Sequence, residues 1–105
     1  MNMHQIILVG RATKDAEEIK SKSKKSFAKF SLAVNEYRGK DLEEKTYFYE
    51  ILVFGTGVEG VMKNVKKGDT VMAMGKPEVD AYISTKDKEP KASITVLADS
   101  WRVLK

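Results

Sequence analysis

The sequence contains no cysteine, which excludes disulfides and thiolate metal ligands. Its single histidine, His4, excludes a metal site made of several histidines and gives little support to a His-based catalytic triad. No glycine-rich phosphate loop is present, because Gly55, Gly57 and Gly60 lack a following Gly-Lys-Ser/Thr. We therefore expect a protein without catalytic activity, cofactor or metal ion.

Long hydrophobic segments are also lacking, and no apolar run approaches the roughly 20 residues of a membrane span. Residues 1–5 have neither the basic start nor the long apolar stretch of a secretory signal. Together with the absence of cysteine, this favours a cytoplasmic protein. The 105 residues suffice for one domain with one modest core, which we expect to span residues 1–105.

The charge balance is moderately basic. Lysine and arginine number 19 against 15 aspartates and glutamates, so the formal net charge is +4. Such a balance favours polyanionic partners such as nucleic acids. Surface lysines that only keep the protein soluble would give the same net charge. Charge alone therefore does not distinguish a nucleic-acid-binding protein from other soluble proteins.

Five segments have the composition and alternation of β-strands. In residues 27–37 apolar and polar side chains alternate, which predicts one buried face that includes Phe30 and one polar face. The glycine and proline of Gly75-Lys76-Pro77 predict a bend or bulge inside the fourth strand. The five segments are residues 6–9, 27–37, 46–55, 69–83 and 91–103.

Between the third and fourth segments the spacing of apolar residues changes from that of a strand to that of a helix. Val58, Val61, Met62 and Val65 follow the i, i+3, i+4, i+7 spacing of one helical stripe. Thr56, with Glu59 three residues later, predicts a capping box at its start. The order predicts an all-β fold, a five-stranded OB-fold barrel with one short helix between strands 3 and 4.

Aromatic residues stand among polar ones on the predicted sheet. Phe48 and Phe54 share a parity on the third strand, Tyr37 ends the second, and Tyr82 lies late in the fourth. Exposed rings on an open sheet stack with unpaired bases without reading their sequence. For Phe48 and Phe54, parity leaves core and surface equally open.

Basic residues flank these aromatic positions and would suit a groove that follows a phosphate backbone. Each of them, taken singly, is also compatible with simple solvation. The candidates are Arg11, Lys14, Lys29, Arg38, Lys76 and Lys86.

The segments in order resemble the bacterial single-stranded-DNA-binding proteins. The resemblance is carried by IILVGRATKDAE at residues 6–17, FSLAVN at 30–35, residues 46–55, VKKGD at 65–69 and ADS at 98–100. It implies a homo-oligomer, commonly a tetramer, that wraps single-stranded DNA during replication, recombination or repair. By alignment, the family's base-stacking aromatic positions fall on Tyr37, Phe48, Phe54 and Tyr82.

The chain departs from that family in two places. The family's motif has a proline where this sequence has Ala16, which affects only the local turn. The family usually continues into a flexible linker and an acidic tip that recruits replication or repair proteins, whereas this sequence ends in the basic Arg102-Val103-Leu104-Lys105. The sequence carries no acidic recruiting tail, and contacts with replication or repair proteins stay open.

The first strand predicts self-association. Ile6-Ile7-Leu8-Val9 is apolar on both faces, and a lone barrel would bury only one of them. We expect His4 and residues 6–9 to form an interface between copies, giving a homodimer at least and a homotetramer by resemblance. Trp101, the only tryptophan, is expected at the barrel surface or against a partner subunit.

Three alternative functions remain open at this stage. A primosomal replication protein of the same fold would bridge DNA and partner proteins. An RNA-binding OB domain would prefer RNA through the 2′-hydroxyl. A purely structural oligomer would bind no nucleic acid.

Overall fold

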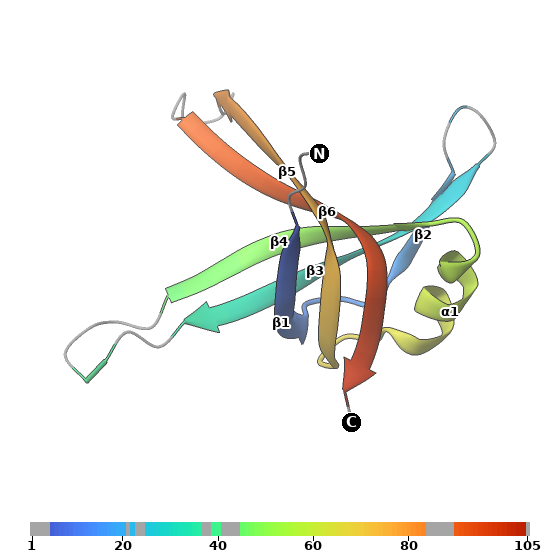
Figure 1. The fold of residues 1–105 in the computed structure, drawn as a ribbon, viewed down its shortest axis with the longest axis horizontal. Helices are drawn as coiled ribbons and strands as arrows, with labels where there is room; N and C mark the ends of the chain where they lie inside the picture. Colours follow the sequence, from blue (N-terminus) through green and yellow to red (C-terminus); the bar gives the residue numbers. More distant parts are fainter. Residues whose placement is uncertain are drawn as a thin grey trace.

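The computed structural model describes residues 5–20, 22, 25–36, 39–40, 45–83 and 90–104, and for 80–83 and 90–93 the backbone only. No helix within this part of the chain is long and apolar enough to cross a membrane. The elements follow in the order β1 (Ile6–Ala12), β2 (Glu17–Lys20), β3 (Ser26–Glu36), β4 (Lys45–Phe54), α1 (Gly57–Asn64), β5 (Thr70–Ile83) and β6 (Pro90–Leu104) (Figure 1).

The strands form one sheet in the order β1-β5-β6-β4-β3-β2, and a further pairing between β1 and β3 closes it into a barrel. All pairings are antiparallel except that between β4 and β6. The predicted OB-fold barrel is confirmed, with its helix after the third of the five predicted strands. The hairpins β3–β4 and β5–β6 extend beyond the barrel in different directions (Figure 1).

Strand β2 was not predicted. Its sequence, Glu17-Glu18-Ile19-Lys20, has one apolar residue and no alternation that would mark a strand. It forms because it pairs with β3, with Glu17 opposite Lys29 and Ile19 opposite Phe27. Cross-strand pairing of this kind stabilises a strand whose own sequence is neutral.

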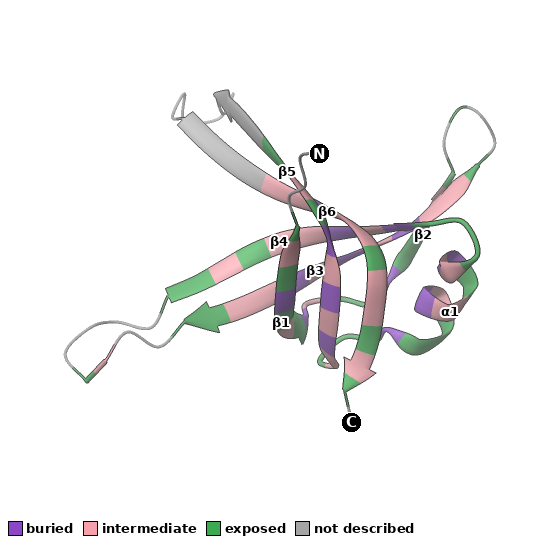
Figure 2. Ribbon diagram, viewed as in Figure 1, coloured by how far each residue is buried: buried purple, intermediate pink, exposed green. Residues whose placement is uncertain are grey.

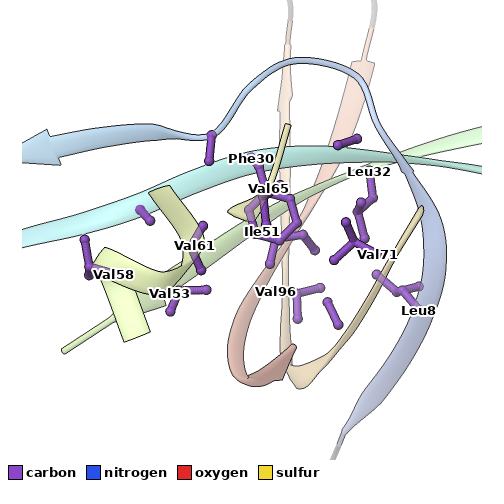
Figure 3. Packing of buried hydrophobic residues seen from close by; sticks show 14 residues of the cluster. Leu8, Phe30, Leu32, Ile51, Val53, Val58, Val61, Val65, Val71 and Val96 are labelled. Atoms are coloured by element: carbon purple, nitrogen blue, oxygen red, sulfur yellow. The ribbon is translucent and has the colours of Figure 1, made fainter. Parts of the chain in front are cut away.

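The core lies inside the barrel, where alternate residues of each long strand point (Figure 3). Leu32, Ile51, Val71 and Val96 come from four different strands and are fully buried. Phe30 is 3 % exposed, as predicted. Figure 2 shows the alternation directly as buried bands separated by half-buried and exposed ones.

Helix α1 packs its apolar stripe on the core. Val58 and Val61 are buried, as the spacing predicted. The predicted capping box is wrong, because the Thr56 side chain makes no capping hydrogen bond. A capping residue needs an extended backbone to direct its side chain at the free N–H groups, whereas Thr56 is helical at φ −69° and ψ −16°.

Trp101 lies half-buried against the helix. A Cβ built on Gly60 would lie 3.2 Å from Cζ2 of its ring, and one on Gly57 would lie 3.6 Å from Nε1. The two glycines lower the intrinsic helix stability. In exchange, they let the indole approach the helix closely and cover that part of the core.

A β-bulge lies where the predicted bend was expected. Met74 pairs with Ser100 but Gly75 pairs with Ala98, so Asp99 has no partner on β5. The extra residue reverses the inward and outward parity along β6. A side chain on Gly75 would overlap the carbonyl of Leu97, so glycine is required there.

Candidate nucleic-acid interface

Four neighbouring strands present one continuous outer face, which we call the aromatic face. Residues directly opposite each other in a sheet point to the same side, so the registers of β3, β4, β6 and β5 define its members. The described side chains on it are Phe27, Lys29, Ser31, Ala33, Asn35, Thr46, Phe48, Glu50, Leu52, Phe54, Thr95, Leu97, Lys76 and Glu78.

Two phenylalanines on this face are open to solvent. Phe48 is 66 % exposed and Phe54 is 53 % exposed, although both lie in a strand whose other face carries the core. They are six residues apart on β4 and therefore about 20 Å apart along the strand. Parity alone allowed either core or surface for these two residues, and both lie on the surface.

A third ring belongs to the same surface. Phe27 lies directly opposite Phe54, with ring centroids 5.1 Å apart and planes tilted by 33°. Ile19 of β2 lies opposite Phe27 on its other side. Phe27 was not among the predicted stacking residues. Its parity with Lys29 placed it on the polar face of its strand, but its contact with Phe54 depends on the β3–β4 register.

The basic candidates occupy different parts of the surface. Arg11 lies opposite Ala33, which in turn lies opposite Phe48, so its strand position is on the row of that ring. Lys76 lies opposite Leu97 at the β5 side of the face and is exposed. Lys14 is exposed in the turn after β1, outside the paired rows.

Lys29 is placed differently from the other basic candidates. Its Nζ lies 3.4 Å from Oε1 of Glu50, on the neighbouring strand of the same face. The structure therefore places Lys29 on the predicted surface, but with a carboxylate partner of this chain.

The remaining candidates cannot be placed in the same way. The backbone of Tyr82 lies opposite that of Lys91, on the hairpin that continues the face, but its side chain is not described. Tyr37, Arg38 and Lys86 lie outside the described residues. Of the four predicted stacking residues, the structure thus brings Phe48 and Phe54 together on one face.

Asp15, in the turn before β2, has a structural role. Oδ1 of Asp15 accepts a hydrogen bond of 2.8 Å from the backbone N–H of Lys67, which ties the β1–β2 turn to the end of the helix. Within the described residues, no cluster of three or more histidines and acidic residues is arranged to hold a metal ion.

A second outer surface lies on β1, β5 and β6, and we call it the apolar face. Ile7 is 65 % exposed and Val9 is 51 % exposed, and they lie opposite the half-buried Met74 and Met72. The side chains on this face are Ile7, Val9, Arg11, Thr70, Met72, Met74, Ser100, Arg102 and Leu104, and Arg11 lies at its margin because it pairs with both Thr70 and Ala33.

The residues expected at a contact between copies divide between the two sides of β1. Ile7 and Val9 point outward, whereas Leu8 is 6 % exposed and belongs to this chain's own core. The side chain of Leu8 is therefore not available to a second copy. Ile6 is half-buried against the core, and His4 lies outside the described residues.

Comparison with known sequences gives a consistent result. The sequence pattern of the single-strand binding protein family matches residues 3–104. The chain is 25 % identical over 103 residues to the single-stranded DNA-binding protein 1 of Streptococcus pyogenes, covering 97 % of this chain and 78 % of that protein. It is 32 % identical over 103 residues to a single-stranded DNA-binding protein of Staphylococcus aureus, covering 97 % of this chain and 65 % of that protein.

Two solved structures have the same fold. A Plasmodium falciparum SSB in complex with single-stranded DNA superposes with a TM-score of 0.79 at 22 % identity, covering 100 % of this chain and 97 % of that one. The small single-stranded DNA-binding protein of Streptomyces coelicolor gives 0.78 at 17 % identity, covering 98 % and 95 %. At these identities the likeness establishes the fold.

Proposed function

Because the chain belongs to the single-strand binding protein family, whose members bind DNA without catalysing a reaction, we propose that it binds single-stranded DNA on the aromatic face without reading the base sequence. The observation that carries this proposal is the exposure of Phe48 and Phe54 on one open sheet face. We further propose that the whole of residues 1–105 acts as one such binding domain.

Stacking explains why the face would be indifferent to sequence. Every base has a π-face, and a stack on an aromatic ring is worth about 1–3 kcal/mol per base. The distance of about 20 Å between Phe48 and Phe54 leaves room for several nucleotides between them. Tyr37 and Tyr82 remain proposed as further stacking residues.

Basic side chains would supply the remaining attraction. Arg11 on the row of Phe48 and Lys76 beside Leu97 are exposed and border the face on opposite sides. Neutralising phosphates releases counterions from the strand, which makes such binding salt-dependent. Lys14, Arg38 and Lys86 are proposed to act in the same way.

The apolar face would pair with a second copy of this chain. Within the described residues β1 pairs with β3 only at Arg11 and Ala12, and Gly10 lies against Ala33 and Val34, so the edge of Ile6 to Val9 is open to another strand. Exposed apolar edges of this kind are normally covered in soluble proteins. We therefore propose a homodimer, and two dimers in a tetramer. Several binding faces on one DNA strand would raise the avidity.

The cellular role follows from the binding mode. A protein that coats exposed strands without reading sequence would protect or organise them in replication, recombination or repair. The cytoplasmic location and the contacts with replication or repair proteins remain predictions from the sequence.

A titration with three nucleic acids tests the proposal. Single-stranded DNA, duplex DNA and RNA of equal length are titrated at two salt concentrations. We expect single-stranded DNA to bind tightest, with similar affinity for different base sequences and weaker binding at high salt. Preference for RNA would favour an RNA-binding domain, and absence of binding to any of the three would favour a structural oligomer.

A further inference from the structure

An ion pair lies in the middle of the aromatic face. Glu50 stands on β4 two residues from Phe48 and two from Leu52, all pointing to the same side. Its Oε1 lies 3.4 Å from Nζ of Lys29, with side-chain exposures of 46 % for Glu50 and 34 % for Lys29. A strand that runs from Phe48 to Phe54 would pass directly over this pair.

The surroundings of the pair are acidic. Glu17 of β2 lies directly opposite Lys29. On the other side, Thr95 lies opposite both Glu50 and Glu78, so two carboxylates share one row across the face. The centre of the face therefore carries more negative than positive side chains, although its margins carry Arg11 and Lys76.

We propose that Glu50 limits the affinity of this face for single-stranded DNA by holding Lys29 in an ion pair that a phosphate must displace. The proposal rests on the proposed function. Glu50 thereby sets the affinity of the chain for single-stranded DNA and the salt dependence of that affinity.

Counterion exchange gives the physical reason. A free lysine that contacts a phosphate releases about 0.7 of a counterion from a single strand. While Lys29 stays paired with Glu50, its ammonium group makes no phosphate contact and releases no counterion. The pair thus contributes little net affinity and little salt dependence, although a lysine is present at the surface.

Replacing Glu50 by glutamine tests this directly. Glu50→Gln should steepen the slope of log K against log salt by about 0.7. The affinity of the variant relative to the unchanged protein should therefore be about fivefold higher at 0.1 M salt than at 1 M salt. The matched control is Glu59→Gln, because Glu59 is exposed in the first turn of α1 and its loss changes the net charge equally. Equal effects of both substitutions would overturn the proposal.

A second substitution separates the action through Lys29 from simple repulsion by Glu50. Lys29→Gln added to Glu50→Gln should remove the gain and return the slope to that of the unchanged protein. If the double variant keeps the gain, Glu50 acts on the DNA by itself and the proposal is wrong. Thermal unfolding of each variant shows whether the fold is intact.

The design distinguishes failure of this inference from failure of the proposed function. The binding face is wrongly assigned if the unchanged protein does not bind single-stranded DNA, or if the Phe48→Ala variant binds it as tightly as the unchanged protein. Glu50 then has no such role. If the unchanged protein binds and Phe48→Ala lowers its affinity, equal salt slopes for Glu50→Gln and Glu59→Gln overturn only the inference about Glu50.

Discussion

The two outer faces of the barrel differ in how they combine apolar and charged side chains. Strand β5 contributes to both, with Met72 and Met74 on the apolar face and Lys76 and Glu78 on the aromatic face. The bulge between Met74 and Gly75 marks the boundary. On one side of the bulge apolar side chains dominate, and on the other aromatic rings stand among charged side chains.

The difference indicates different partners. Covering the apolar face with another protein surface removes apolar area from water at about 25 cal/mol per Å² and desolvates few charges. Covering the aromatic face in that way would also desolvate Lys29, Glu50, Lys76 and Glu78, which is costly unless each finds a partner. A single strand of nucleic acid suits the second face better, because it offers π-faces and phosphates together.

The largest expected effect comes from removing the two exposed rings. Phe48→Ala combined with Phe54→Ala should weaken single-strand binding by roughly 2–6 kcal/mol, the sum of two base stacks. The loss should be similar for different base sequences. Fluorescence anisotropy with a labelled oligonucleotide measures it.

The matched control for this variant lies on the other face. Ile7→Thr combined with Val9→Thr should leave the affinity for an oligonucleotide short enough for one barrel unchanged. Circular dichroism must show the same fold for both proteins. Normal affinity in a folded Phe48→Ala, Phe54→Ala protein would contradict the assignment of the binding face.

The second effect concerns self-association. Ile7→Thr with Val9→Thr keeps the β-branched side chains that favour a strand but makes the apolar face polar. The two changes remove three apolar carbons per subunit and six in a symmetric dimer, which at about 0.8 kcal/mol each is about 5 kcal/mol at full burial. Because Ile7 is 65 % and Val9 51 % exposed in one subunit, association should weaken by roughly 2–4 kcal/mol.

Sedimentation equilibrium over a wide concentration range measures this shift towards the monomer. The phenylalanine variant serves as the reciprocal control and should keep the parent mass. A parent protein that is already monomeric at micromolar concentration, with and without DNA, would contradict the proposed dimer.

A smaller effect is expected at the edge of the aromatic face. Lys76→Gln should flatten the slope of log K against log salt by about 0.7, the contribution of one phosphate contact. Lys63→Gln changes the charge equally, and Lys63 is exposed in the last turn of α1, outside the strand rows that define the face. If both variants flatten the slope to the same extent, Lys76 acts only through net charge.

The order of the elements was predictable from the sequence because it depends on local patterns. Alternation in residues 27–37 and helical spacing from Val58 to Val65 are both visible in a single window. The strand Ser26–Glu36 and the helix Gly57–Asn64 confirm them, except that Val65 is extended and residue 37 lies outside the described residues. Strand β2 was not predictable, because its four residues become a strand only through their pairing with β3. The same applies to the reversal of parity at Asp99, which exists only relative to β5.

The candidate site was predictable in part for the same reason. Parity placed Phe48 and Phe54 on one side of β4, and this grouping is confirmed. The contact of Phe27 with Phe54 and the pairing of Lys29 with Glu50 both require the β3–β4 register. That register depends on the hairpin between the strands, and no local pattern specifies it.

The smallest expected effect is at Trp101, whose fluorescence should change little when single-stranded DNA binds. The indole packs on Gly57 and Gly60 of α1, and its strand position opposite Ala73 points to the core side rather than to the aromatic face. A ring in that position has no base to stack with, so saturating DNA should leave its emission nearly constant, while unfolding should change it strongly. The measurement is a titration of tryptophan emission in parallel with anisotropy of the labelled DNA. Strong quenching at saturation would mean that the DNA runs over the helix side of the barrel, and the two faces would then have to be reassigned.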